Sequence, residues 1–150
     1  MNTIYVDTSV FGGCYDQVFK EYSNKLLDGF KQGKMKMMVS NLVGDELMDA
    51  AEEIKIQALQ VPFIHTIYTK APFKAYALAG RYIAEGALKL SSLTDAMHIA
   101  TATLQGADIL ASWNFKHIVN KGKIEIYNAI NKDMGYRTIQ IKSPREILNP

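Results

Sequence analysis

Four side chains with oxygen donors stand at the ends of predicted strands or near the starts of predicted helices: Asp7, Glu46, Asp95 and Asn114. Three of these are carboxylates and the fourth is an amide. Mg²⁺ and Mn²⁺ prefer oxygen ligands of this kind, whereas zinc prefers nitrogen and sulfur. Because the carboxyl ends of parallel strands meet at one edge of a sheet, we expect the four residues to lie close together there. The set therefore predicts a Mg²⁺ or Mn²⁺ site with Asp7, Glu46 and Asp95 as metal ligands.

Each of these residues also fits a structural role. Asp7 fits an Asx turn or a helix cap, and Asn114 fits a turn. Asp95 ends an S-x-x-D capping box that begins at Ser92. Glu46 fits a plain surface role less well, because it falls on the inward stripe of its predicted helix, where a carboxylate without a partner is costly. The metal interpretation therefore rests on the set of residues and not on any single member.

Predicted strands alternate with predicted helices along the chain. Strands are expected at residues 4–6, 35–40, 63–69, 109–112 and 138–141. Helices are expected at residues 16–33, 41–51, 52–59, 73–84, 92–104 and 123–134, with a short last helix that starts at Pro144. Residues 11–13 are expected to form a turn. Strands separated by helices imply βαβ units, and therefore an α/β fold with a mainly parallel sheet that is covered by helices on both faces.

The composition indicates one globular domain over residues 1–150. Apolar residues make up 48% of the sequence and charged residues 21%, which excludes a disordered chain. Cys14 is the only cysteine, so no disulfide can form within the chain, and a reducing, cytoplasmic location is expected. No stretch approaches the roughly 18 apolar residues of a membrane span, and the start of the chain lacks the basic segment of a signal peptide. We therefore expect a soluble protein with no membrane partner.

Motifs for several other chemistries are missing from the sequence. It contains no G-x-x-x-x-G-K-[ST] loop, no G-x-G-x-x-G fingerprint and no G-x-S-x-G elbow. Aspartyl-phosphate phosphatases also begin with a strand that ends in Asp, but they need a second Asp two positions later, where this chain has Ser9. His65, His98 and His117 are too dispersed for a structural zinc site. On its largely apolar helix, His98 fits a hydrogen-bonded core histidine better than a catalytic one.

Basic residues gather toward the end of the chain. Residues 113–150 contain seven Lys or Arg and three Asp or Glu, whereas residues 1–112 contain ten and twelve. This excess is either a solvated basic segment or a surface that follows phosphates. Three lysines after the fourth site residue are candidates for substrate binding: Lys116, Lys121 and Lys123. Ser9 is a further candidate, because it can hydrogen-bond Asp7 or the substrate. Trp113 either stacks on a base or, as we favour, packs in the core.

Four segments of the chain resemble the PIN-domain family in their order and spacing: Val6–Ser9, Val39–Leu47, Leu93–Ala100 and Ser112–Phe115. The likeness spans about Ile4 to Ile118 and is greatest to the VapC-like branch, the ribonuclease toxins of toxin–antitoxin pairs. This resemblance implies a three-layer α/β/α sandwich and metal-dependent cleavage of RNA. It also implies a cognate antitoxin and a homodimer, with Tyr76 and Tyr82 either at the dimer interface or in the core.

The resemblance also assigns the site residues. Asp7, Glu46 and Asp95 match the three main acidic positions of the family, and Asn114 matches the fourth, where many members have Asp. Toxin-like members often have an Asp three residues after that position, where this chain has His117. Both differences remove negative charge, so we expect one ion to be held well and a second only weakly. They also favour an alternative, a catalytically weakened PIN-like domain that binds RNA or protein.

In the expected mechanism, each of these catalytic residues has its own role. Asp7 and Asp95 bind the ion directly or through water, and Glu46 binds it or orients the attacking water. Asn114 holds a ligand water or a phosphate oxygen. The ion lowers the pKa of a bound water and stabilises charge on the scissile phosphate. A nuclease that acts on DNA instead of RNA remains a third interpretation of the same residues.

Overall fold

The computed structural model describes all 150 residues and contains one parallel sheet with five strands. The strands are β1 (Thr3–Val6), β2 (Lys36–Ser40), β3 (Thr66–Thr69), β4 (Ile109–Ala111) and β5 (Gln140–Lys142). They lie in the order β3-β2-β1-β4-β5, and every neighbouring pair is parallel. The prediction of a mainly parallel sheet is confirmed. The chain builds outward from β1 to β3 and then crosses to β4 on the other side of β1, so the strand order reverses between β1 and β4.

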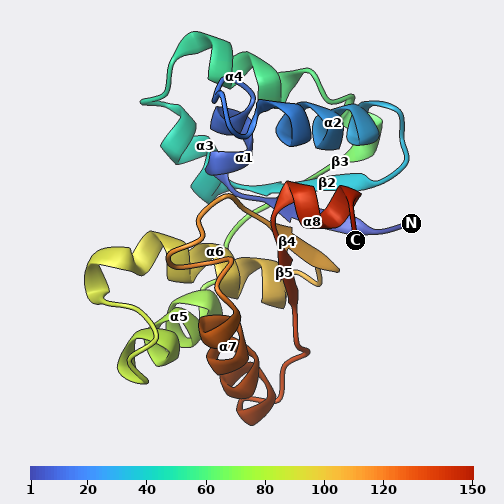
Figure 1. The fold of residues 1–150 in the computed structure, drawn as a ribbon. Coiled ribbons are helices and arrows are strands. Elements are labelled where there is room, and N and C mark those ends of the chain that lie inside the picture. Colours follow the sequence, from blue (N-terminus) through green and yellow to red (C-terminus); the bar gives the residue numbers. More distant parts are fainter.

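Helices cover both faces of this sheet and complete the expected three-layer α/β/α sandwich (Figure 1). One face carries α1 (Thr8–Gly13), α2 (Lys20–Lys31), α3 (Asn41–Leu47), α4 (Glu52–Leu59) and α8 (Pro144–Leu148). The other face carries α5 (Lys74–Ala84), α6 (Leu93–Leu104) and α7 (Lys121–Asp133). None of these helices combines the length and the apolar character needed to cross a bilayer.

Alternating side chains of the central strands build one hydrophobic core on each face. Ile4 and Val6 of β1 pack in the core beneath α1 and α2, whereas Tyr5 points into the core beneath α5, α6 and α7. In β4, Ile109 lies on the first side and Leu110 on the second. A parallel sheet that is buried on both faces needs apolar residues at nearly every strand position. This requirement explains the short continuous apolar runs that predicted the strands.

The predicted turn at residues 11–13 is wrong, because these residues complete helix α1. Gly13 has no positive φ and is not a turn residue. A β-carbon on Gly13 would lie 2.5 Å from Ser23 Oγ and 2.7 Å from Trp113 Nε1, so glycine is needed there for close packing. Trp113 also stacks on Phe19 at 4.2 Å between ring centroids and donates from Nε1 to Ser23 Oγ. The expectation that Trp113 packs in the protein is confirmed.

Two further expectations change in the structure. Only Thr66–Thr69 of the strand predicted at residues 63–69 pairs with the sheet, because Phe63–His65 form a 3₁₀ turn after Pro62. Tyr82 is fully buried and belongs to the core, so it cannot supply a dimer interface, whereas Tyr76 is exposed.

Candidate active site

The predicted site residues lie along the edge formed by the carboxyl ends of the strands. Asp7 directly follows β1, and Glu46 is on α3, which starts directly after β2. Asn114 is in the loop after β4. Asp95 is in the first turn of α6, whose other end leads into the start of β4, so this first turn lies at the same edge. Asp7 therefore stands where the strand order reverses, which is the usual place for ligand binding in open α/β sheets.

Asp7 is a buried carboxylate that forms no ion pair with Lys or Arg. Its Oδ1 accepts a hydrogen bond from the Ser9 hydroxyl at 2.6 Å, and its Oδ2 accepts one from the Ser112 hydroxyl at 2.5 Å. The loop after β4 holds both serines, because Ser9 Oγ accepts from the Trp113 amide and Ser112 Oγ from the Asn114 amide. Burial raises the pKa of Asp7 above its ordinary value. Asp7 occupies the N-cap position of α1, as its structural alternative expected, but its side chain makes no capping hydrogen bond.

Glu46 lies at the rim of the sheet edge and contacts α6. Its Oε1 accepts hydrogen bonds from the Thr8 hydroxyl at 3.0 Å and from His98 Nε2 at 2.6 Å. Burial pushes the pKa of Glu46 up, but the hydrogen bond and charge of His98 and the Thr8 hydroxyl together lower it below its ordinary value. The side chain is 39% exposed, so the predicted inward position is wrong. In the short helix α3, Val43 faces the core, and Glu46 reaches over the edge of the sheet toward α6.

His98 connects Glu46 to a buried chain of hydroxyl groups. Its Nδ1 lies 2.7 Å from the Tyr5 hydroxyl, which lies 2.7 Å from Ser40 Oγ. A carboxylate only accepts hydrogen bonds, so Nε2 of His98 must donate to Glu46. When His98 is neutral, Nδ1 accepts from Tyr5 and Tyr5 accepts from Ser40; when His98 is charged, Nδ1 donates to Tyr5 and Tyr5 donates to Ser40. The expectation of a hydrogen-bonded core histidine is confirmed, and this histidine also orients Glu46.

Asp95, Asn114 and His117 form a second hydrogen-bonded group. Asp95 Oδ2 lies 2.9 Å from His117 Nδ1, and Asn114 Oδ1 accepts from the His117 backbone amide at 2.9 Å. Asn114 therefore fills the turn role that was its alternative. The capping box expected between Ser92 and Asp95 is absent, because the Ser92 side chain makes no cap hydrogen bond and lies 3.4 Å from His117 Nδ1. Asp95 is thus held by a histidine and not by a helix cap.

The donors at this edge fit a hard divalent cation in their chemistry. Glu46 Oε2 and Asp95 Oδ1 make no hydrogen bond within the protein. Each oxygen of Asp7 accepts one hydrogen bond and keeps a second lone pair. However, no three acidic, histidine or cysteine side chains are grouped so that they hold one metal ion. The four predicted site residues therefore share an edge but form two hydrogen-bonded groups, one around His98 and one around His117.

The predicted substrate-binding lysines lie in two different hollows. Lys116 and Lys123 line a hollow that also includes His117. Lys121 lines another, together with Glu125 and Glu146. Neighbouring carboxylates weaken the attraction of Lys121 for a phosphate, so Lys116 and Lys123 are the stronger candidates.

Sequence reasoning missed three residues that hydrogen-bond these carboxylates, Thr8, Ser112 and His98 as a partner of Glu46. It also missed Ser40, which contacts the Tyr5 hydroxyl behind His98. Ser112 follows β4 directly, so the rule that singled out Asp7 would also have found it. His98 lies one turn after Asp95 on α6, but nothing in that spacing points to Glu46. Tyr5 gave no signal, because a tyrosine inside a buried strand is normally core.

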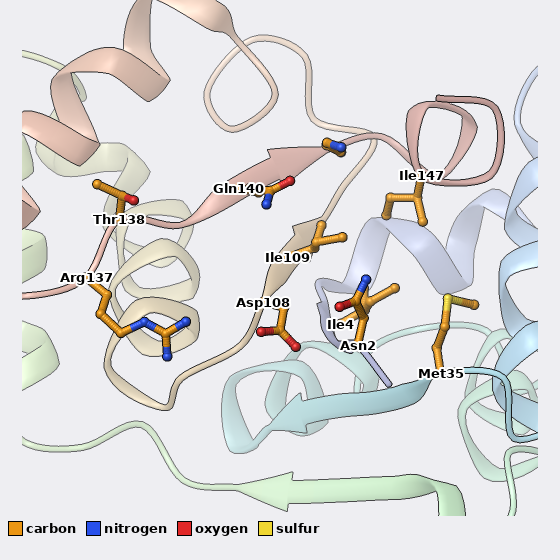
Figure 2. A pocket seen from close by; sticks show the side chains of 10 residues that line it. Asn2, Ile4, Met35, Asp108, Ile109, Arg137, Thr138, Gln140 and Ile147 are labelled. Carbon is orange, nitrogen blue, oxygen red and sulfur yellow. The ribbon is translucent and has the colours of Figure 1, made fainter.

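A separate hollow of about 610 Å³ lies at the opposite edge of the sheet (Figure 2). Asp108, directly before β4, and Arg137, shortly before β5, extend toward it. Asp108 also accepts a hydrogen bond from the Thr3 amide through Oδ2. None of the predicted site residues lines this hollow, so it is distinct from the candidate active site.

Together, these features define an α/β protein with a five-stranded parallel sheet and acidic residues along the carboxyl edge. Sequence comparison finds no matching family model and no matching curated protein. Structure comparison finds VapBC2 from Rickettsia felis bound to a DNA fragment from its promoter, with a TM-score of 0.55 and 12% identity over 94% of this chain and 98% of that chain. It also finds VapC20 from Mycobacterium tuberculosis, a Sarcin-Ricin loop cleaving toxin, with a TM-score of 0.58 and 15% identity over 76% of this chain and 92% of that chain. The chain therefore has a VapC-like PIN fold.

The raised pKa of Asp7 predicts an unusual pH dependence of stability. The folded state binds the Asp7 proton more tightly than the unfolded state does, so protonation of Asp7 stabilises the folded protein. This stabilisation is complete below the unfolded pKa of about 4 and is lost as pH rises through the folded pKa. Urea unfolding in EDTA between about pH 4 and about pH 8 measures it, with Asp7→Asn as the comparison. The stability of wild type relative to Asp7→Asn should fall as pH rises.

The comparison with Asp7→Asn is necessary because Glu46, whose pKa is lowered, has the opposite effect. Its contribution is lost as pH falls through its folded pKa. Since both proteins contain Glu46, its contribution largely cancels in the difference. A difference that does not change with pH would contradict the assignment of Asp7 as an uncompensated buried carboxyl.

Proposed function

We propose that this protein is a metal-dependent endoribonuclease that hydrolyses RNA phosphodiester bonds, and that it is the toxin of a toxin–antitoxin pair. The observation that carries the proposal is Asp7, a buried carboxylate without a Lys or Arg partner, at the point where the strand order reverses. Glu46 and Asp95 lie along the same edge and each keeps a free oxygen. Like charges at one edge raise each other's proton affinity unless a cation neutralises them.

The residues of this chain have separate roles in the proposed reaction. Since no three of these side chains close around a single ion, Asp7, Glu46 and Asp95 would hold Mg²⁺ or Mn²⁺ partly through bridging waters. When bound, such an ion lowers the pKa of a water ligand and stabilises charge on the scissile phosphate. His98 orients Glu46, so that Oε2 of Glu46 is available to orient the attacking water. The Asn114 side-chain nitrogen makes no hydrogen bond in the protein and can donate to a phosphate oxygen.

Of the two roles expected for Ser9, the contacts favour the hydrogen bond to Asp7. Its hydroxyl already donates to Asp7 and accepts from the Trp113 amide. We therefore propose that Ser9 positions Asp7 and does not bind substrate. The basic residues that follow β4 contact the substrate instead.

The structural neighbours support the choice of RNA and of a protein partner. The M. tuberculosis neighbour is described as a toxin that cleaves the Sarcin-Ricin loop, which favours RNA as the substrate. The R. felis neighbour is VapBC2 bound to promoter DNA, which favours an antitoxin partner for this chain. We also propose that the chain forms a homodimer and acts in the cytoplasm.

Incubation of the purified chain with RNA and Mn²⁺ tests the proposed activity. The expected result is RNA cleavage that is lost in EDTA and in Asp7→Asn. A DNA strand of equal sequence in a parallel reaction separates a ribonuclease from a nuclease that acts on DNA. RNA binding without cleavage at micromolar protein would favour the catalytically weakened alternative.

Asn114→Asp should tighten Mn²⁺ binding several-fold. The new carboxylate can still accept the hydrogen bond from the His117 amide, so the turn is preserved. A charged ligand contributes about 1 kcal/mol more than a neutral one in comparable hydrogen bonds, and we expect a gain of that order. Calorimetric titration of Mn²⁺ into both proteins measures the change.

Asn2→Asp is the matched control for this titration. It adds the same charge in the hollow at the opposite edge of the sheet and should leave Mn²⁺ affinity unchanged. If Asn114→Asp binds Mn²⁺ no better than wild type, residue 114 does not lie at the metal edge.

A further inference from the structure

Three lysines line a hollow of about 400 Å³ beside the candidate active site: Lys89, Lys116 and Lys123. The hollow lies between residues 86–92, which connect α5 to α6, and the segment from the loop after β4 into α7. No carboxylate lines it, and none of the three lysines forms an ion pair. We call this hollow the lysine pocket.

Its lining differs from that of the other hollows that contain basic residues. Lys121 shares its hollow with Glu125 and Glu146. Arg137 shares the hollow at the opposite edge with Asp108. In the lysine pocket the positive charges have no counter-ion within the protein, so the group that complements them is an anion.

Two serine hydroxyl groups in the pocket indicate which kind of anion it binds. Ser91 and Ser92 supply hydroxyl groups next to the lysines. Ammonium and hydroxyl donors around one space suit a phosphate, whose oxygens accept several charge-assisted hydrogen bonds. The volume lies within the range of pockets that take ligands of nucleotide size.

His117 joins the pocket to the acidic edge. It lines the pocket, and its Nδ1 lies 2.9 Å from Asp95 Oδ2. We infer that the lysine pocket binds a backbone phosphate of the RNA strand beside the acidic edge, where His117 contacts Asp95. This inference rests on the proposed function and adds to it the site that positions the RNA strand.

Charge-removing variants test the inference by RNA binding in the absence of metal. Lys89→Gln, Lys116→Gln and Lys123→Gln each keep a long polar side chain but lose the charge. Anisotropy of a labelled single-stranded RNA in EDTA gives the affinity across a range of salt concentrations. Each variant should bind about three- to tenfold more weakly at low salt, and the slope of log K against log salt should become shallower by roughly 0.7 per lysine.

Lys132→Gln is the matched control, because Lys132 is an exposed lysine in the last turn of the same helix, α7, without an ion pair. It should bind RNA like wild type. Thermal melting checks that every variant is folded. In wild type, RNA should also shift the NMR signals of the His117 imidazole, a measurement that needs no substitution.

The outcomes separate this inference from the proposed nuclease activity. Weaker binding by the three pocket variants supports the pocket even if the chain cuts no RNA. Wild-type affinity and salt slope in these variants would overturn it, even if the chain cuts RNA efficiently. Failure of the wild-type chain to bind RNA would overturn it as well.

Discussion

Asp7→Asn should reduce metal-dependent RNA cleavage by at least about a hundredfold and at the same time stabilise the metal-free protein. The carboxylate is buried and has no Lys or Arg partner, and an amide removes that uncompensated charge. We expect the free energy of unfolding in EDTA to rise by about 1–2 kcal/mol. Mn²⁺ should raise the melting temperature of wild type by mass action and have little effect on the variant. Cleavage assays and melting curves with and without Mn²⁺ measure both effects.

Asp108→Asn provides the control for this pair of measurements. Asp108 lies at the opposite edge of the sheet and accepts a hydrogen bond from the Thr3 amide, which an asparagine oxygen can also accept. This variant should keep both the cleavage rate and the response to Mn²⁺. If Asp7→Asn destabilises the metal-free protein and leaves the Mn²⁺ response unchanged, Asp7 is a structural residue and not a metal ligand.

His98→Ala should lower the free energy of unfolding by about 2–4 kcal/mol, because it leaves a cavity and removes two hydrogen bonds from the interior. His98 is 2% exposed and bridges Tyr5 and Glu46. Loss of the bridge also frees Glu46, so RNA cleavage should fall. Urea unfolding measures the stability.

His117→Ala is the comparison for this variant, because His117 also contacts a carboxylate, but its side chain is 24% exposed. We expect a cost of about 1 kcal/mol, since water can replace the lost contact. Tyr5→Phe combined with His98→Ala should cost less than the sum of the single changes, because both remove the same hydrogen bond. Additive costs, or a cost below 1 kcal/mol for His98→Ala, would contradict the role of His98 as a buried bridge.

The order of elements along the chain was enough to predict the architecture and the edge that carries the site. The apolar runs around Tyr5, Met38 and Leu110 are separated by helices, and such connections lead to parallel strands. In a parallel sheet all strands end at the same edge. Asp7 directly follows a strand, Glu46 is on the helix that follows the second strand, and Asp95 is in the first turn of a helix. These positions placed them at that edge without knowledge of any contact.

Only the tertiary structure decided what each carboxylate contacts. Asp7 is hydrogen-bonded by Ser112, 105 residues away, and Glu46 by His98, 52 residues away. The first pair depends on β1 lying beside β4, and the second on how α3 and α6 pack over the sheet edge, whereas periodicity describes one element at a time. The same limit explains the wrong expectations for Glu46 and Gly13. A helical stripe cannot show that a short helix ends at the rim of the sheet, and a glycine pair cannot show that Trp113 packs against it, because both features arise from contacts between segments that are distant in the chain.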